Sequence, residues 1–189
     1  MEIDVRPAVA ADRGDIDGIL TTSWGAPRVA VSGHLYDLTG LPTIVATMQG
    51  TIVGVLTYHT QGESIEVMSI DAVLPRRGIG TLLLDAAADA GRAQGARRLI
   101  LVTTNDNIDA LRFYQRRGLR ILEVRPNAVA ASRAVKPSIP QVGEYGIPIR
   151  DEIVLGRSLD AEGAGREPDG QAPGATGPAT TAGRDSVTS

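Results

Sequence analysis

Alternation of polar and apolar residues predicts a run of antiparallel strands in the first half of the chain. Residues Glu2–Pro7 alternate in the manner of a strand with one buried face. Two apolar segments then flank the turn Gln49-Gly50 and a third follows the turn Gln61-Gly62, so three strands joined by tight turns are expected. A helix is expected over 12–20 and a loop over 33–41. The expected strands are Glu2–Pro7, Arg28–Ser32, Thr43–Met48, Thr51–His59 and Ser64–Ile70.

The periodicity changes to that of helices in the second half. From Gly78 onward apolar residues recur every three or four positions, the spacing that places them on one face of a helix. These residues are Ile79, Leu82, Leu83, Ala86, Ala87 and Ala90. The further elements expected are a strand Arg97–Val102, a helix Asn107–Arg117, a strand Leu119–Val124, a short helix Ala128–Val135 and a final strand Arg150–Leu155. The sequence thus predicts an α/β (α+β) domain over residues 1–159, in which one mixed sheet continues the meander.

The composition changes after Leu159. Residues 160–189 are rich in Gly, Ala, Pro and Thr and hold almost no large apolar side chain. Such a segment buries too little surface to offset its ordering entropy, so a disordered tail is expected. Five acidic and two basic residues of this tail account for the whole formal net charge of -3, which leaves the folded part close to neutral.

This composition argues against several classes of function. A nearly neutral folded part disfavours broad electrostatic binding of nucleic acid or of an anionic membrane. The absence of cysteine excludes disulfides, cysteine nucleophiles and thiolate metal sites, and two histidines without a dense acidic cluster argue against a metal site. The N-terminus lacks the apolar stretch of a signal peptide and no segment is long enough for a membrane span, so a cytoplasmic protein is expected.

The most informative segment, Met68–Thr81, joins a strand to the strongest helix. The first-turn amides of a helix have no internal partner, and the helix dipole adds positive potential there. Gly78 and Gly80 let a bulky anion approach the backbone, and Arg76 and Arg77 add charge, so a pyrophosphate cradle is indicated. The alternative is an ordinary strand-to-helix connection with two solvated arginines, because short glycine motifs are common by chance. The segment lacks the Gly-Lys-Ser/Thr ending of a Walker loop and the third glycine of a dinucleotide fingerprint.

This segment resembles the acetyl-CoA motif of the GNAT acetyltransferases, Q/R-x-x-G-x-G/A after a strand. Gly78 and Gly80 occupy its two small positions, whereas Pro75 stands where the family has Gln or Arg. The departure removes one backbone amide, and Arg76 or Arg77 is expected to supply the displaced charge.

A second segment, Asn107–Leu119, is similar to the family pattern N-x-x-A-x-x-F-Y-x-x-x-G-F. Only the final Phe differs, being Leu119 here. One helix and one strand separate the two segments, as they do in the family, and residues 3–8 also resemble a GNAT N-terminus. The resemblance covers residues 1–156.

The resemblance implies a mixed, twisted central sheet with helices on both faces and two splayed central strands. Acetyl-CoA would lie in the splay, with its pantetheine arm beside the strand that holds Met68 and Ile70. Asn107 would bind the cofactor near this arm. Many members of the family are dimers, so a homodimer is compatible with the resemblance. The pyrophosphate would be held by the backbone of Arg76, Arg77, Gly78, Ile79, Gly80 and Thr81.

Acetyl transfer to an amine needs a free lone pair on the amine, a donor for the developing oxyanion and a proton for the leaving thiolate. Tyr114 is the predicted acid, since a phenol with a pKa of about 10 is protonated at neutral pH. The alternative is that Tyr114 only packs against the sheet from its helix. The match of Asn107–Gly118 to the family pattern favours the role of acid. A backbone N–H near Met68 is the expected oxyanion donor. No covalent acyl-enzyme is expected, because the chain has no Cys and shows no Ser–His pairing.

Glu66 is the predicted base. The period of two along a strand places it on the same face as Met68 and Ile70, where it would take the amine proton directly or through water. An equally weighted alternative is that Glu66 is only an exposed carboxylate at the edge of the sheet, without a role in catalysis. The other candidates are Glu63, Asp71 and His59.

The sequence does not identify the acceptor, and a small amine and a protein N-terminus both stay open. The early and late loops, 24–41 and 126–149, are expected to bind it. The candidate residues are Trp24, Tyr36, Glu144, Asp151 and Glu152. The predicted function is that of an N-acetyltransferase with acetyl-CoA as cosubstrate. The alternatives are a non-catalytic acyl-CoA-binding sensor or partner module and a structural protein without a cofactor.

Overall fold

Seven strands form one twisted sheet in the computed structural model, which describes residues 2–74 and 76–160. Their order across the sheet is β1-β4-β5-β6-β7-β9-β8. Their bounds are β1 Asp4–Pro7, β4 Thr43–Met48, β5 Thr51–Gln61, β6 Ser64–Ala72, β7 Arg98–Thr104, β8 Arg120–Arg125 and β9 Glu152–Ser158. Two further strands, β2 (Arg28–Val31) and β3 (His34–Asp37), form a separate hairpin.

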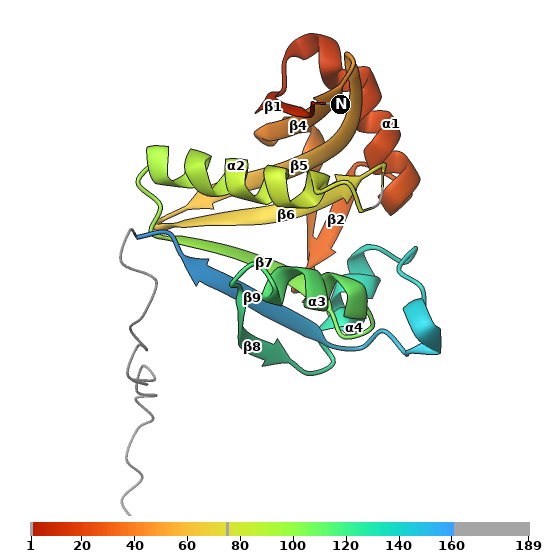
Figure 1. Ribbon diagram of the computed structural model, residues 1–189. Helices are drawn as coiled ribbons and strands as arrows, with labels where there is room; N and C mark the ends of the chain where they lie inside the picture. The colour runs from red at the N-terminus through yellow and green to blue at the C-terminus, as the bar shows by residue number, and fades with distance from the viewer. Residues whose placement is uncertain (1, 75, 161–189) are drawn as a thin grey trace, which may run out of the picture.

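The two central strands of this sheet separate along their length. β4, β5 and β6 pair antiparallel, as the predicted meander requires. β6 and β7 are parallel, and they pair only over Ser64–Val67 and Arg98–Leu101. Beyond these residues the strands diverge, with β6 continuing to Ala72 and β7 to Thr104 (Figure 1). The predicted mixed sheet with splayed central strands is therefore confirmed.

Helices cover both faces of the sheet. α2 (Ile79–Ala93) and α3 (Ile108–Gln115) pack on the face that Leu56, Ile65 and Leu99 also bury, which we call the α2 face. α1 (Arg13–Trp24) and the β2–β3 hairpin pack on the opposite face, called the α1 face. α4 (Ala128–Val135) lies against the hairpin. The side chains that α1 buries are Ile16 and Leu20, and the largest that α2 buries are Ile79, Leu83 and Leu84.

A β-bulge changes which face β6 presents. The ladder between β5 and β6 passes from Val67 to Ser69 and skips Met68. Met68 consequently packs on the α1 face, whereas Ile70 packs on the α2 face. The prediction that Met68 and Ile70 share a face is wrong, because one extra residue reverses the alternation beyond it.

A second prediction that fails is the loop over 33–41. The chain instead forms β3 and a 3-10 turn, Leu38–Gly40. Ser32 and Gly33 have φ values of 50° and 77°, which is the backbone of a tight two-residue hairpin turn. The two strands that flank this turn pair antiparallel, from Val31 with His34 next to the turn to Arg28 with Asp37 at the far end.

The other predicted elements are present, with ends that shift by a few residues. Pro75, which departs from the loop motif, and residues 161–189, for which a disordered tail is expected, lie outside the described residues. Within the described part of the chain, no helix is long and apolar enough to cross a membrane. The same residues hold no group of three His, Asp or Glu side chains placed to bind a metal ion.

Candidate functional site

A cleft of about 490 Å³ lies at the N-terminus of α2, between this helix and α3. Gly78 is the N-cap residue of α2, with φ 78°. The first backbone bond of α2 runs from the Thr81 amide to the Gly78 carbonyl oxygen, at 3.0 Å. The amides of Ile79 and Gly80 precede it and are not part of the hydrogen-bond ladder of the helix. Together with the helix dipole, these amides make the cleft suitable for an anion. The predicted loop residues all line it, namely Arg76, Arg77, Gly78, Ile79, Gly80 and Thr81.

Three arginines that the sequence did not single out line the opposite wall of the cleft. They are Arg112, Arg116 and Arg117. Arg117 donates to Thr81 Oγ1 at 2.7 Å and to the Phe113 carbonyl oxygen at 3.0 Å, and its guanidinium lies 3.7 Å from the centroid of the Phe113 ring. The four-residue spacing of Arg112 and Arg116 was the signal available in the sequence, because it places both on one side of the chain at the C-terminal end of α3. The described part of the cleft thus has five arginines in its lining, of which Arg112 lies 3.7 Å from the carboxylate of Asp109 in the same lining.

A second cavity, of about 840 Å³, lies where β6 and β7 diverge. It is lined by Val67–Ile70 of β6 and Leu101–Thr104 of β7, and its other walls come from β2, α4 and the segment 138–149. The cleft at α2 and this cavity share three lining residues, which are Ile70, Ala110 and Tyr114. A molecule bound in the cleft and one bound in the cavity can therefore meet beside Tyr114.

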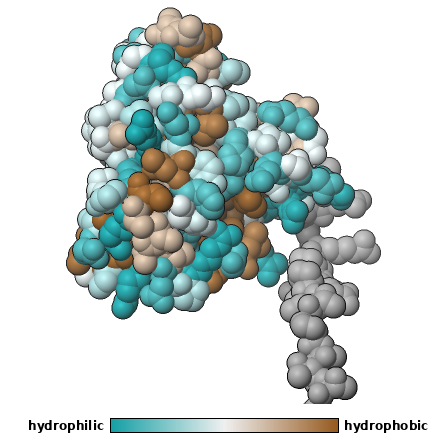
Figure 2. All heavy atoms as spheres, turned by 180° about the vertical axis from the view of Figure 1, so that it is seen from behind, coloured by the Kyte–Doolittle hydropathy of each residue, from teal (hydrophilic) through white to brown (hydrophobic). Residues whose placement is uncertain are grey.

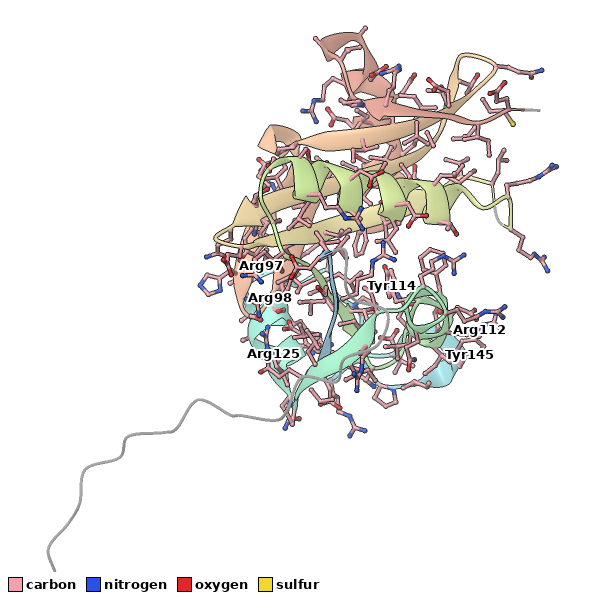
Figure 3. All side chains as sticks on the ribbon, turned by 60° about the vertical axis from the view of Figure 1, so that its left-hand side comes forward. Arg97, Arg98, Arg112, Tyr114, Arg125 and Tyr145 are labelled. Carbon is pink, nitrogen blue, oxygen red and sulfur yellow. The ribbon has the colours of Figure 1, made fainter. Side chains whose placement is uncertain are left out.

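Tyr114 is placed on α3 with its side chain 8% exposed, and Figure 3 shows it near Arg112 of the same helix. Its ring packs edge-on against Phe113, with 5.3 Å between the centroids. Burial raises the pKa of the Tyr114 phenol above its usual value, and the negative charge of Asp71 raises it further. The phenol is therefore protonated at neutral pH and can donate a proton.

Met68 and Asn107, which were both predicted to bind the cofactor, line the larger cavity. Met68 lies outside the paired register on both sides, because the β5 ladder skips it and the β7 ladder ends at Val67. Asn107 Oδ1 accepts the Ala110 amide at 3.2 Å and so caps α3. The amide nitrogen of the Asn107 side chain is the group that can contact a bound molecule.

The four candidate bases occupy different environments. Glu66 is not among the described residues that line the cavity, and its Oε2 lies 3.2 Å from His59 Nε2. Glu63 is exposed at the start of β6. Asp71 accepts the Trp24 indole N–H at 3.1 Å, and burial raises the pKa of its carboxyl. Of these four, Asp71 is the one whose charge acts on the phenol of the predicted acid.

Three of the five predicted acceptor residues line the larger cavity, and they are Trp24, Glu144 and Glu152. The other two do not. The Tyr36 ring packs near the His59 ring, with centroids 6.1 Å apart. Asp151 accepts the Asn127 amide at 2.8 Å and so holds the start of α4.

Asp106 also lines this cavity and was not predicted. The residue follows β7 and precedes α3 in the chain, and it is 5% exposed. Oδ1 accepts the Thr104 hydroxyl at 2.5 Å, and Oδ2 accepts the Glu144 amide at 3.3 Å. The polar run from Thr104 to Asn107, directly after an apolar strand, was the signal available in the sequence.

The model of the acetyltransferase (GNAT) family matches residues 17–119, a range that contains both motifs and more than half of the chain. The chain belongs to the GNAT family. This membership agrees with the splay between β6 and β7 and with the anion cleft at α2.

Two curated relatives come from Bacillus subtilis (strain 168). The uncharacterized protein YdhI is 40% identical over 138 residues, which cover 72% of this GNAT chain and 86% of YdhI. The uncharacterized protein YxbD is 35% identical over 158 residues, which cover 83% of this chain and 99% of YxbD.

Solved structures of similar fold include two acetyltransferases. An IAA acetyltransferase from Bacillus cereus superposes with a TM-score of 0.63 at 22% identity, over 83% of this chain and 99% of that one. A GNAT acetyltransferase from Elizabethkingia anophelis with acetyl-CoA bound superposes with a TM-score of 0.59 at 21% identity, over 82% and 97% of the two chains. At these identities the comparison establishes the fold.

Proposed function

We propose that this GNAT protein is an N-acetyltransferase that moves the acetyl group of acetyl-CoA directly to an amine. The observation that carries the proposal is the meeting of an anion cleft and a second cavity at Tyr114. The cosubstrate would enter through the cleft and the amine through the cavity, so that thioester and nitrogen approach beside the phenol. The structural relative with acetyl-CoA bound supports this choice of cosubstrate.

The cosubstrate would be held by groups of both walls of the cleft. The pyrophosphate would accept hydrogen bonds from the amides of Ile79 and Gly80 at the start of α2, and the arginines of the loop and of α3 would balance its charge. The pantetheine arm would run beside β6 beyond Val67, where β7 no longer supplies a ladder. Asn107 would contact the arm from the start of α3.

The transfer would form one bond and break one bond. The amine nitrogen attacks the thioester carbonyl carbon, and collapse of the tetrahedral intermediate breaks the C–S bond. The Met68 N–H would stabilise the oxyanion, and Tyr114 would protonate the leaving thiolate. Glu66 would accept the amine proton through water, since it lies beside His59 and is not among the described residues that line the cavity.

A non-catalytic acyl-CoA-binding module is the second candidate function. It is favoured by the positions of the four predicted bases, because none of them is among the described residues that line the cavity. Such a module would bind acetyl-CoA without acetylating any amine.

Calorimetric titration of acetyl-CoA tests the cleft directly. A Cβ at position 80 would lie 3.0 Å from Phe113 Cζ, and the carboxylate of Gly80→Asp would enter the anion site. We expect micromolar binding by the wild type, a modest loss in Gly80→Ala and no binding by Gly80→Asp. Gly14→Asp is the matched control, because position 14 is exposed on α1 with no atom within 4 Å of its Cβ. Equal binding by Gly80→Asp and the wild type would refute the assigned cleft. A separate assay of thiol release from acetyl-CoA in the presence of amines distinguishes the two candidate functions, because only a transferase releases the thiol.

A further inference from the structure

The larger cavity contains a buried carboxylate without a basic partner. Asp106 is 5% exposed, and no ion pair of residues 2–74 and 76–160 includes it. Buried carboxylates are normally paired with a cation, because burial of a lone charge is costly. Lys136 lines the same cavity, but its ammonium donates to the carbonyl oxygens of Trp24 and Arg28 at 3.0 and 2.7 Å. The charge of Asp106 is therefore available to a cationic ligand.

Most of the remaining wall of this cavity is apolar. Six of the apolar side chains are Val29, Val31, Met68, Leu101, Val129 and Ile149. An ammonium ion alone would leave this surface wet, whereas an apolar body attached to it would gain about 25 cal/mol for each Å² removed from water. A ligand that fits the whole cavity thus carries one cation and an apolar part.

The β2–β3 hairpin is fastened over this cavity. At its tip, the Ser32 amide and hydroxyl donate to the two oxygens of Glu152 at 2.8 and 2.9 Å, and the Gly33 amide donates to Ser132 Oγ at 3.1 Å. Glu152 is 2% exposed. The bond from Lys136 to the Arg28 carbonyl oxygen fastens the other end of β2. An extended polypeptide would have to lift this hairpin, whereas a small molecule would fit beneath it.

The segment 138–149 closes the cavity from the side of α3. The Tyr145 hydroxyl donates to Asp109 Oδ2 on α3 at 2.6 Å, and Figure 3 shows Tyr145 beside that helix. The Glu144 amide is bonded to Asp106 itself. In the view from behind, hydrophobic residues are interspersed with hydrophilic ones over this face of the molecule (Figure 2). These two hydrogen bonds hold the segment 138–149 in place as one wall of the cavity.

We propose that the acceptor is a small primary amine with an apolar body, whose ammonium group binds Asp106 beneath the β2–β3 hairpin, and that polypeptide N-termini are excluded. The identity of the cavity as the acceptor site rests on the proposed acetyl transfer. Its volume of about 840 Å³ is that of a small-molecule site, with room for the acetyl group at Tyr114. Asp106 would position the nitrogen. The ammonium group would first give one proton through water to Glu66, the proposed base, and the neutral amine would then attack the thioester.

The test is calorimetry of the full chain with three probes, namely phenethylamine, phenethyl alcohol and the tetrapeptide Phe-Ala-Ala-Ala. The alcohol keeps the apolar body without the charge, and the peptide keeps a primary amine and the ring on a longer chain. We expect phenethylamine to bind at least about tenfold more tightly than either, since a charge-assisted hydrogen bond is stronger than a neutral one. Asp106→Asn should weaken the amine about tenfold and leave the alcohol unchanged. Asp89→Asn, on the exposed side of α2, is the matched control.

Equal binding of the amine and the alcohol by the wild type, or peptide binding as tight as that of the amine, would overturn the inference. These wild-type comparisons hold even if Asp106→Asn does not fold. Acetyl-CoA is titrated in the same series. If it does not bind while the amine binds in the charge-dependent manner, the proposed transfer fails and the amine site stands. If acetyl-CoA binds and the charge of the amine makes no difference, the amine site fails and the proposed transfer stands.

Discussion

Replacing Tyr114 by Phe removes one oxygen atom at the point where the cleft and the cavity meet. The ring stays in its buried position, and its edge-on contact with Phe113 stays intact. The Tyr114 hydroxyl makes no hydrogen bond to another described residue, so its removal breaks no hydrogen bond within the described part of the chain. The change is therefore confined to the proton that the phenol can donate.

The expected effect on turnover is large and that on stability is small. A positioned general acid contributes about 10²–10⁴-fold to a rate, which is about 2.7–5.4 kcal/mol of barrier at 1.36 kcal/mol for each factor of ten. Loss of a hydroxyl without a protein partner should change the free energy of unfolding by less than about 1 kcal/mol. We expect kcat to fall at least about a hundredfold, with acetyl-CoA affinity within about threefold of the wild type.

Thiol release, acetyl-CoA calorimetry and urea unfolding measure the three quantities. Tyr58→Phe is the control for loss of a buried phenol, because Tyr58 is also 8% exposed and lines neither the cleft nor the cavity. Its hydroxyl accepts a hydrogen bond of 3.4 Å from Gln94, so a small loss of stability is expected in this control alone. A Tyr114→Phe enzyme that keeps its kcat, or one that loses turnover and cosubstrate affinity to the same extent, would refute the acid role.

Two further substitutions test the cleft and the pH dependence of stability. Arg117→Ala removes the hydrogen bond to Thr81 and the contact with the Phe113 ring. Acetyl-CoA should therefore bind about tenfold more weakly, and urea unfolding should show a free energy of unfolding that is lower by about 1–2 kcal/mol. Unchanged values would contradict the place of Arg117 in the cleft. Hydrogen bonds from Arg6 and from a backbone amide lower the pKa of Asp12 to about 2, so its charged form stabilises the fold above its unfolded pKa of about 3.8. That stabilisation is lost as the pH falls through about 2. Urea midpoints should therefore fall less between pH 7 and 2 in Asp12→Asn than in the wild type, and parallel profiles would contradict the ion pair.

The predicted elements were found where local chemistry decides the backbone. The meander and α2 follow from their own periodicity and turn residues, and both are present. The bulge at Met68 was not predictable, because an extra apolar residue in an apolar strand leaves no mark in the sequence. The strand β3 was missed because Gly33 was interpreted as the start of a loop rather than as half of a hairpin turn.

The candidate site divides in the same way. The wall of the cleft formed by residues 76–81 was predicted, because glycines and a helix start mark an anion site within one segment. Arg117 and Asp106 were missed, since their roles depend on segments that meet only in the folded chain. Strand alternation predicted that Glu66 shares a face with Met68 and Ile70, but the bulge puts those two on opposite faces. Glu66 lies 3.2 Å from His59 and is not among the described residues that line the cavity. The assignments of acid, base and cofactor contacts stay predictions.

The most direct test of the account is to measure free CoA and acetylated phenethylamine together in one reaction of the wild-type protein with acetyl-CoA. Mass spectrometry quantifies both products and any acetyl group left on the protein. The account predicts that CoA and the acetylated amine form in equal amounts, far faster than without protein, and that the protein itself stays unmodified. Binding of acetyl-CoA with no acetylated amine above the uncatalysed rate, for this and other small amines, would contradict acetyl transfer and leave a module that only binds acyl-CoA.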